Sequence, residues 1–225
     1  MGVAPVTEYS RKDWRFAGIV TLIIFLLGAC NLTPGLPAWG DDHAAYLNEG
    51  IAIAEGRFEE QTRRNYSYHA SELPKEAEDG RLVYVWGYPL FIAGIYKLVG
   101  FDRVNYSSII WYKLIPLLSL SLTGGVLTLL LRRRFPLYVS AGTALVFCMS
   151  GDLFEALNTL YSDPLFLFFT MLTLLMMEVF SSQAGKGGEG KTGWNGLWLG
   201  LFYGFSLWMT YETRLSGFTD RKSVV

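Results

Sequence analysis

The residues best suited to chemistry in this chain are acids that flank its apolar segments. Asp41 and Asp42 come directly before His43, in the first hydrophilic segment after the first apolar run, and Asp163 opens a later apolar run. Ionisable groups at or within membrane spans are functional candidates, because they are costly to keep there. Asp42 and Asp163 also have a structural interpretation, since each stands where a carboxylate caps a helix.

Two cations belong to the same set. Lys113 lies near the start of one apolar run, and Arg214 follows the last one. Either side chain could extend its charged end to the membrane surface, but cations at this depth could also hold a lipid phosphate. The loop at residues 151–162 contains Glu155 and no Lys or Arg. We therefore predict that acids and phosphate-seeking cations meet on one side of a membrane.

A metal site has weaker support. Asp41, Asp42, His43 and Asp163 could supply oxygen and imidazole ligands to a divalent cation. Residues that are merely adjacent in sequence do not define a site, so no metal ligand is predicted and a divalent cation remains only an option.

The cysteines indicate neither a metal site nor a disulfide. Cys30 and Cys148 have no metal-type spacing, and we interpret both as small hydrophobic residues. Residues 27–30 are similar to a bacterial lipobox, but the later apolar runs favour a membrane anchor at this position.

Apolar helices must position these groups. Of the 225 residues, 51% are hydrophobic and 16% are aromatic, and the net charge of -1 gives no indication of nucleic-acid binding. Backbone groups in a membrane must be paired within each segment, and the apolar runs lack the alternation of a membrane barrel. The chain is therefore predicted to be an all-α, polytopic membrane protein. About five transmembrane helices are expected, near residues 16–32, 109–131, 137–150, 163–180 and 194–211.

Basic residues predict the orientation of these helices. Positive charges fall on alternate loops, at residues 11–15, 132–134 and 186–191. The positive-inside rule assigns those loops to the cytoplasm. The loops at 33–108 and 151–162 then face outward.

The first outward loop is predicted to hold two membrane-skimming helices. One runs from Asp42 to Gly56 and the other lies within residues 84–100, where Trp and Tyr suit the membrane interface. In the first helix one face is predicted to contain Tyr46, Gly50, Ile53 and Ala54. Glu49 and Glu55 are predicted to point elsewhere.

In their order along the chain, five features resemble the GT-C class of polyprenyl-phosphate-dependent glycosyltransferases. They are Asp42-x-x-x-Tyr46 with its Ala/Gly helix, Gly87-Tyr88-Pro89, a basic-ended span, Tyr161-Ser162-Asp163-Pro164-Leu165-Phe166, and Thr213-Arg214-x-x-Gly217. Within the class, the resemblance is to protein O-mannosyltransferases, lipid A aminoarabinose transferases and rhizobial lipopolysaccharide-core glycosyltransferases. Each motif is short, and their order and common side are more specific than any one of them.

The resemblance implies a multi-pass enzyme of the bacterial plasma membrane with its active face outside the cytoplasm. It would move a sugar, with inversion, from a polyprenyl-phosphate donor to an envelope lipid, glycan or protein acceptor. The family pattern Asp-Glu-x-x-Tyr aligns its Asp with Asp42 and replaces its Glu with His43. Asp42 is then the expected general base, and Asp41 is a second candidate that the sequence does not separate from it.

The same resemblance implies roles for the other charged residues. Lys113 and Arg214 would bind the donor phosphate. Asp163, Tyr46 and Glu155 would support the site or contact the substrate. A membrane transporter or lipid-linked sugar flippase is the alternative, although its charges would be expected along a path through several spans, with related halves.

The last six residues have a different origin in our interpretation. Residues 220–225 match the translation of a common short-read sequencing adapter. We therefore expect residues 1–219 to be the N-terminal part of a longer GT-C-like module, and the fragment to be inactive alone.

Overall fold

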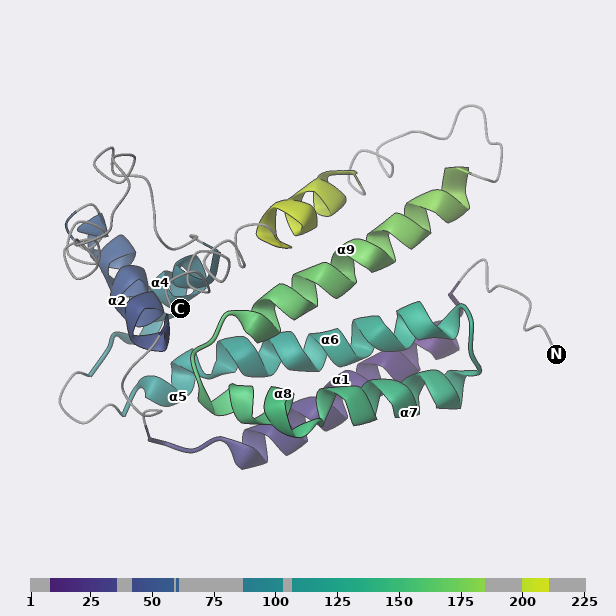
Figure 1. Cartoon of the computed structure of the whole chain (residues 1–225), viewed down its shortest axis with the longest axis horizontal. Coiled ribbons are helices and arrows are strands. Elements are labelled where there is room, and N and C mark those ends of the chain that lie inside the picture. The colour runs from purple at the N-terminus through teal and green to yellow at the C-terminus, as the bar shows by residue number, and fades with distance from the viewer. Residues whose placement is uncertain are drawn as a thin grey trace, which may run out of the picture. The chain divides into compact units, whose positions relative to one another are not determined.

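The structure of the protein is a computed structural model (Figure 1). It describes residues 9–35, 42–58, 60, 87–102, 107–184 and 200–210, apart from the side chains of residues 42–43 and 180–184. Every regular element within these ranges is a helix. The predicted all-α class is therefore confirmed for the part of the chain that the structure describes.

Two helices in these ranges are long and apolar enough to cross a membrane. They are α1 (Arg11–Asn31) and the segment Ile109–Arg132, which comprises α5 (Ile109–Tyr112) and α6 (Leu114–Arg132). A third span results if α7 (Leu137–Cys148) is joined to Gly151–Asn158, from which it is bent by 63°. The structure thus supports two or three of the five predicted spans.

The other two predicted spans also fall on helices. Residues 163–180 lie within α9 (Asp163–Ala184), and the helix at residues 200–210 covers most of the span predicted at 194–211.

The surface of α1 suits a membrane. Large apolar side chains on this helix are about half exposed, among them Ile19 at 51%, Leu22 at 55% and Leu26 at 53%. Such a row of exposed aliphatic side chains is unusual in water. The protein is therefore a candidate for membrane association through at least these apolar helices.

The helix ends follow from local sequence. Ser10 and Asp13 form a capping box at the start of α1, because the Ser10 hydroxyl accepts from the Asp13 N–H and the Asp13 carboxylate accepts from the Ser10 N–H. Pro116 explains why α5 and α6 are separate, since it has no N–H to donate to the carbonyl four residues earlier. The predicted span at 109–131 nevertheless corresponds to one apolar segment, Ile109–Arg132, with a local irregularity at Lys113.

The described residues form two compact units. Unit 1 contains α1, α7, most of α6 and α9, the helix at residues 200–210 and the short helix α8 (Gly151–Glu155). Its helices approach closely at Gly124 and Gly125 of α6, where an added Cβ would overlap side chains of α1. Small residues permit such close helix packing in membranes.

Unit 2 contains α2 (Asp42–Glu55), α4 (Gly87–Val99), α5 and residues 156–163, which begin with the 3-10 helix η2 (Ala156–Asn158). Helix α2 packs against α4, and Gly50 lies directly on Ile92. Both helices end at a glycine with positive φ, Gly56 at 71° and Gly100 at 68°. These glycines terminate the helices in the left-handed conformation that other residues rarely adopt.

The predicted face of α2 is only partly correct. Tyr46, Gly50 and Ala54 are buried as expected. Glu49 is buried as well, with an exposed fraction of 3%. Helix α2 is buried on more than one side, as the buried Leu47 shows.

Candidate functional site

The described candidate residues lie in unit 2, with one exception. Asp42 is the first residue of α2, and Tyr46 follows one turn later. Asp163 is the first residue of α9 and is exposed. Glu155 ends α8, is exposed and belongs to unit 1. Asp41 and Arg214 lie outside the described residues, as does the side chain of Asp42.

Tyr46 connects two of the predicted motifs. Its exposed fraction is 3%, and its hydroxyl lies 3.3 Å from the hydroxyl of Ser162, a residue 116 positions later in the chain. Asp42 precedes Tyr46 by roughly 6 Å along the axis of α2, and Asp163 directly follows Ser162. The Asp42-x-x-x-Tyr46 motif and the Ser162-Asp163 motif therefore meet within one unit.

Tyr88 completes an aromatic pair at this position. Its ring packs edge-to-face on that of Tyr46, with 5.2 Å between the ring centroids. The Tyr88 hydroxyl is fully buried and has no hydrogen-bond partner among the described residues. Burial, with a smaller effect from Tyr46, raises the pKa of Tyr88 far above its ordinary value. Tyr88 therefore remains a protonated phenol, a potential donor.

Glu49 is a candidate acid that the sequence analysis missed. It lies seven positions after Asp42, and this spacing puts both acids on the same face of a helix, with Tyr46 between them. Its exposed fraction is 3%. The helical spacing could have identified it, because positions 42, 46 and 49 follow the same i, i+4, i+7 pattern that defines an apolar face.

Lys113 is fully buried rather than extended toward the surface. Its ammonium donates to the carbonyl of Thr33 at 2.8 Å and to that of Gly35 at 2.7 Å. The Asn158 side-chain oxygen lies at 3.5 Å from it and also accepts from the Thr33 N–H at 2.8 Å. Hydrogen bonds from Lys113 thus connect residues 33–35, which follow α1, to the junction of α5 and α6. A donor phosphate would have to replace one of these carbonyls.

The described residues do not define a metal centre. Among them, no group of three His, Cys, Asp or Glu side chains is close enough to hold an ion. Asp41 and the side chains of Asp42 and His43 are not in that set, so the option of a divalent cation there stays a prediction.

Comparison with known proteins gives no relative. No family model, curated protein or solved structure matches the chain. The case for a function therefore depends on the residues and contacts of this chain.

Proposed function

We propose that this chain is the catalytic-loop part of a membrane glycosyltransferase, which transfers a sugar from a polyprenyl-phosphate donor to a hydroxyl acceptor outside the cytoplasm. The observation that supports the proposal best is the 3.3 Å approach of the Tyr46 and Ser162 hydroxyls. It joins the beginnings of α2 and α9, each of which starts with an aspartate. The order of motifs described above is the second support.

The proposed reaction is a displacement at the anomeric carbon of the sugar. The Asp42 carboxylate accepts the proton of the acceptor hydroxyl, whose oxygen forms the new glycosidic bond. The bond from the anomeric carbon to the phosphate oxygen breaks, and polyprenyl phosphate leaves with the electron pair. A positioned base contributes roughly 10²–10⁴-fold to such a rate.

The surrounding groups have supporting roles in this proposal. Asp163 and Tyr46 would orient the sugar or acceptor hydroxyls, and the ring of Tyr88 would hold the ring of Tyr46 in place. Arg214 would offset the charge that grows on the departing phosphate. Lys113 would add positive charge to the same unit while it holds residues 33–35 in place.

The test is a transfer assay with polyprenyl-phosphate sugar and a hydroxyl acceptor, which measures both glycosylated product and released lipid phosphate. The assay uses the protein inserted in membranes. Asp42→Asn should lower transfer by about 10²-fold or more. Asp152→Asn is the matched control, because it removes an exposed acid from the same predicted side and should leave transfer unchanged.

Two results would change the assignment. Full activity of Asp42→Asn together with loss in Asp41→Asn would move the base to Asp41. Transport of the lipid-linked sugar across sealed vesicles without any product would contradict the transferase and favour the flippase.

A further inference from the structure

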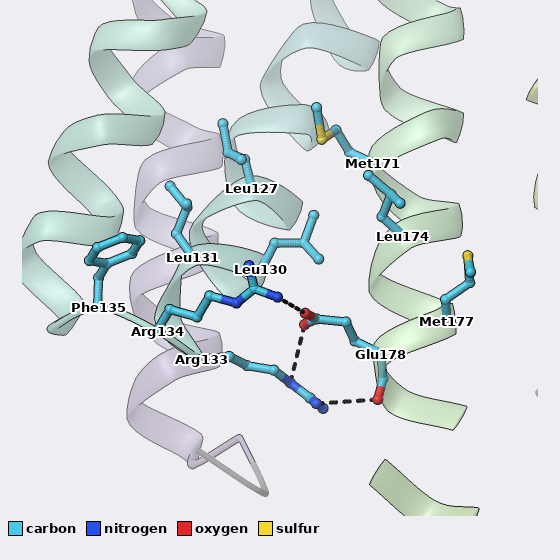
Figure 2. Close-up of a pocket in the computed structure, with 10 residues that line it drawn as sticks. All are labelled: Leu127, Leu130, Leu131, Arg133, Arg134, Phe135, Met171, Leu174, Met177 and Glu178. Carbon is cyan, nitrogen blue, oxygen red and sulfur yellow. Dashed lines mark hydrogen bonds and ion pairs between the residues drawn. The ribbon is translucent and has the colours of Figure 1, made fainter. Parts of the chain in front are cut away.

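An apolar groove lies in unit 1, between the end of α6 and α9. It has a volume of about 790 Å³, and Figure 2 shows the side chains that line it. Its aliphatic walls are formed by Leu127, Leu130, Leu131, Met171, Leu174 and Met177. Two of these side chains are substantially exposed, Leu174 at 44% and Met177 at 47%. Along α9 the groove extends over roughly 10 Å, from Met171 to Glu178.

One end of this groove is cationic. Arg133 and Arg134 both reach Glu178, at 3.4 and 3.7 Å, as Figure 2 shows. Two guanidinium groups therefore share one carboxylate, and the end of the groove has an excess of positive charge. Arg132 does not add to it, because its guanidinium is paired with Asp13 of α1 at 2.8 Å.

Arg134 is the group that can still accept a ligand. Its side chain is 78% exposed, whereas that of Arg133 is 14% exposed. A guanidinium presents several N–H donors in a plane and binds phosphate through two of them at once. The 3.7 Å separation from Glu178 is longer than such a bond, so a phosphate oxygen would be the closer partner.

We propose that this groove binds an anionic phospholipid, with one acyl chain along the Leu and Met walls and the headgroup phosphate at Arg134. The groove is apolar along its length and positive at its end, which complements a molecule with an apolar chain and an anionic head. A packed helix would match the apolar walls but would leave the cationic end without a counterion. The arginines also lie on the loop that the positive-inside rule assigns to the cytoplasm, where anionic lipids attract basic residues.

The experiment measures lipid binding to the full 225-residue chain in a neutral detergent. Phosphatidylglycerol and phosphatidylcholine with identical acyl chains are titrated separately, and bound lipid is counted by native mass spectrometry. The wild-type chain should bind one phosphatidylglycerol in preference to phosphatidylcholine. Arg134→Gln should weaken phosphatidylglycerol binding about fivefold, the effect expected for one basic residue near an anionic headgroup. It should leave phosphatidylcholine binding unchanged.

The acyl chain is tested by filling the groove. Leu174→Trp should weaken the binding of both lipids, and Met177→Trp provides a second variant at a more exposed wall. Circular dichroism checks that each variant keeps the helical content of the wild type. Glycerol phosphate, which has the headgroup chemistry without acyl chains, should not displace the lipid.

Lys12→Gln is the matched charge control, because Lys12 is an exposed cation on the same predicted membrane side but does not line the groove. If Arg134→Gln and Lys12→Gln weakened phosphatidylglycerol binding equally, the attraction would be a general effect of surface charge, and the proposal would be overturned. Unchanged lipid binding in both tryptophan variants would also overturn the proposal. If the wild-type chain bound no phosphatidylglycerol, the proposal would fail as well, and a helix that covers the groove would be favoured. Displacement by glycerol phosphate would assign the end of the groove to free phosphates instead.

Discussion

Replacement of Gly125 by alanine should loosen the contact between α6 and α1. A Cβ at this position would overlap the hydroxyl of Thr21 and lie 3.2 Å from the carbonyl oxygen of Ala17. Thr21 cannot move away freely, because its hydroxyl donates to that same carbonyl at 3.0 Å. Forcing a methyl group into such a contact costs about 1–3 kcal/mol.

Alanine also has a higher helix propensity than glycine, which would offset up to about 1 kcal/mol of this cost. Gly142→Ala isolates that gain, because position 142 is inside α7 and an added Cβ there meets nothing within 4 Å. The two alanine variants should therefore differ in free energy of unfolding by about 1–3 kcal/mol, with Gly125→Ala the less stable.

The assay is equilibrium unfolding in mixed micelles with increasing dodecyl sulfate, followed by far-ultraviolet circular dichroism. Both variants are compared with the wild type under identical conditions. If Gly125→Ala were as stable as Gly142→Ala, the close approach of the two helices at this glycine would be refuted.

Three further predictions concern the polar groups. Lys113→Met should destabilise unit 2 by about 1.5–3 kcal/mol for each short charged hydrogen bond that is lost. Limited proteolysis measures this loss, and a variant as resistant to protease as the wild type would contradict the role of Lys113 in holding residues 33–35. Arg132→Gln should lower the free energy of unfolding by roughly 1–3 kcal/mol, because it leaves the buried Asp13 carboxylate without its ion-pair partner. The loss is smaller than for a fully buried pair because Arg132 is partly exposed. The double variant with Asp13→Asn should recover part of the lost stability. Tyr46→Phe should cost about 0.5–1.5 kcal/mol through the lost contact with Ser162, whereas Tyr88→Phe should be nearly neutral in unfolding experiments at pH 7. Burial raises the pKa of Tyr88 on folding, so above about pH 10 the unfolded chain releases the phenol proton while the folded chain keeps it, and the wild type should lose stability above that pH more steeply than Tyr88→Phe.

The local features of the fold could be predicted from short stretches of sequence. The bounds of α2 agree with the prediction because Asp42 and Gly56 are strong helix start and stop residues. The predicted span at 109–131 agrees with the apolar segment Ile109–Arg132, and Pro116 accounts for its irregularity at Lys113. Local sequence signals therefore located these two helical segments well.

The candidate site was less predictable, because its contacts join distant residues. The role of Lys113 depends on carbonyls 78 and 80 positions earlier, which no periodicity encodes. The burial of Glu49 likewise depends on what surrounds α2, which is more than the single face that its sequence indicated. The spans are an intermediate case, since apolar length identifies them and packing decides where they bend.

The hydrogen bonds of Lys113 affect how the sequence between residues 35 and 113 can vary in evolution. Because one ammonium fastens Thr33 and Gly35 to the start of the next span, the intervening chain is a loop closed at its base. The entropic cost of such closure grows only slowly with length. Related sequences could therefore lengthen or exchange the interior of the loop while Lys113 and its two carbonyl partners stay the same.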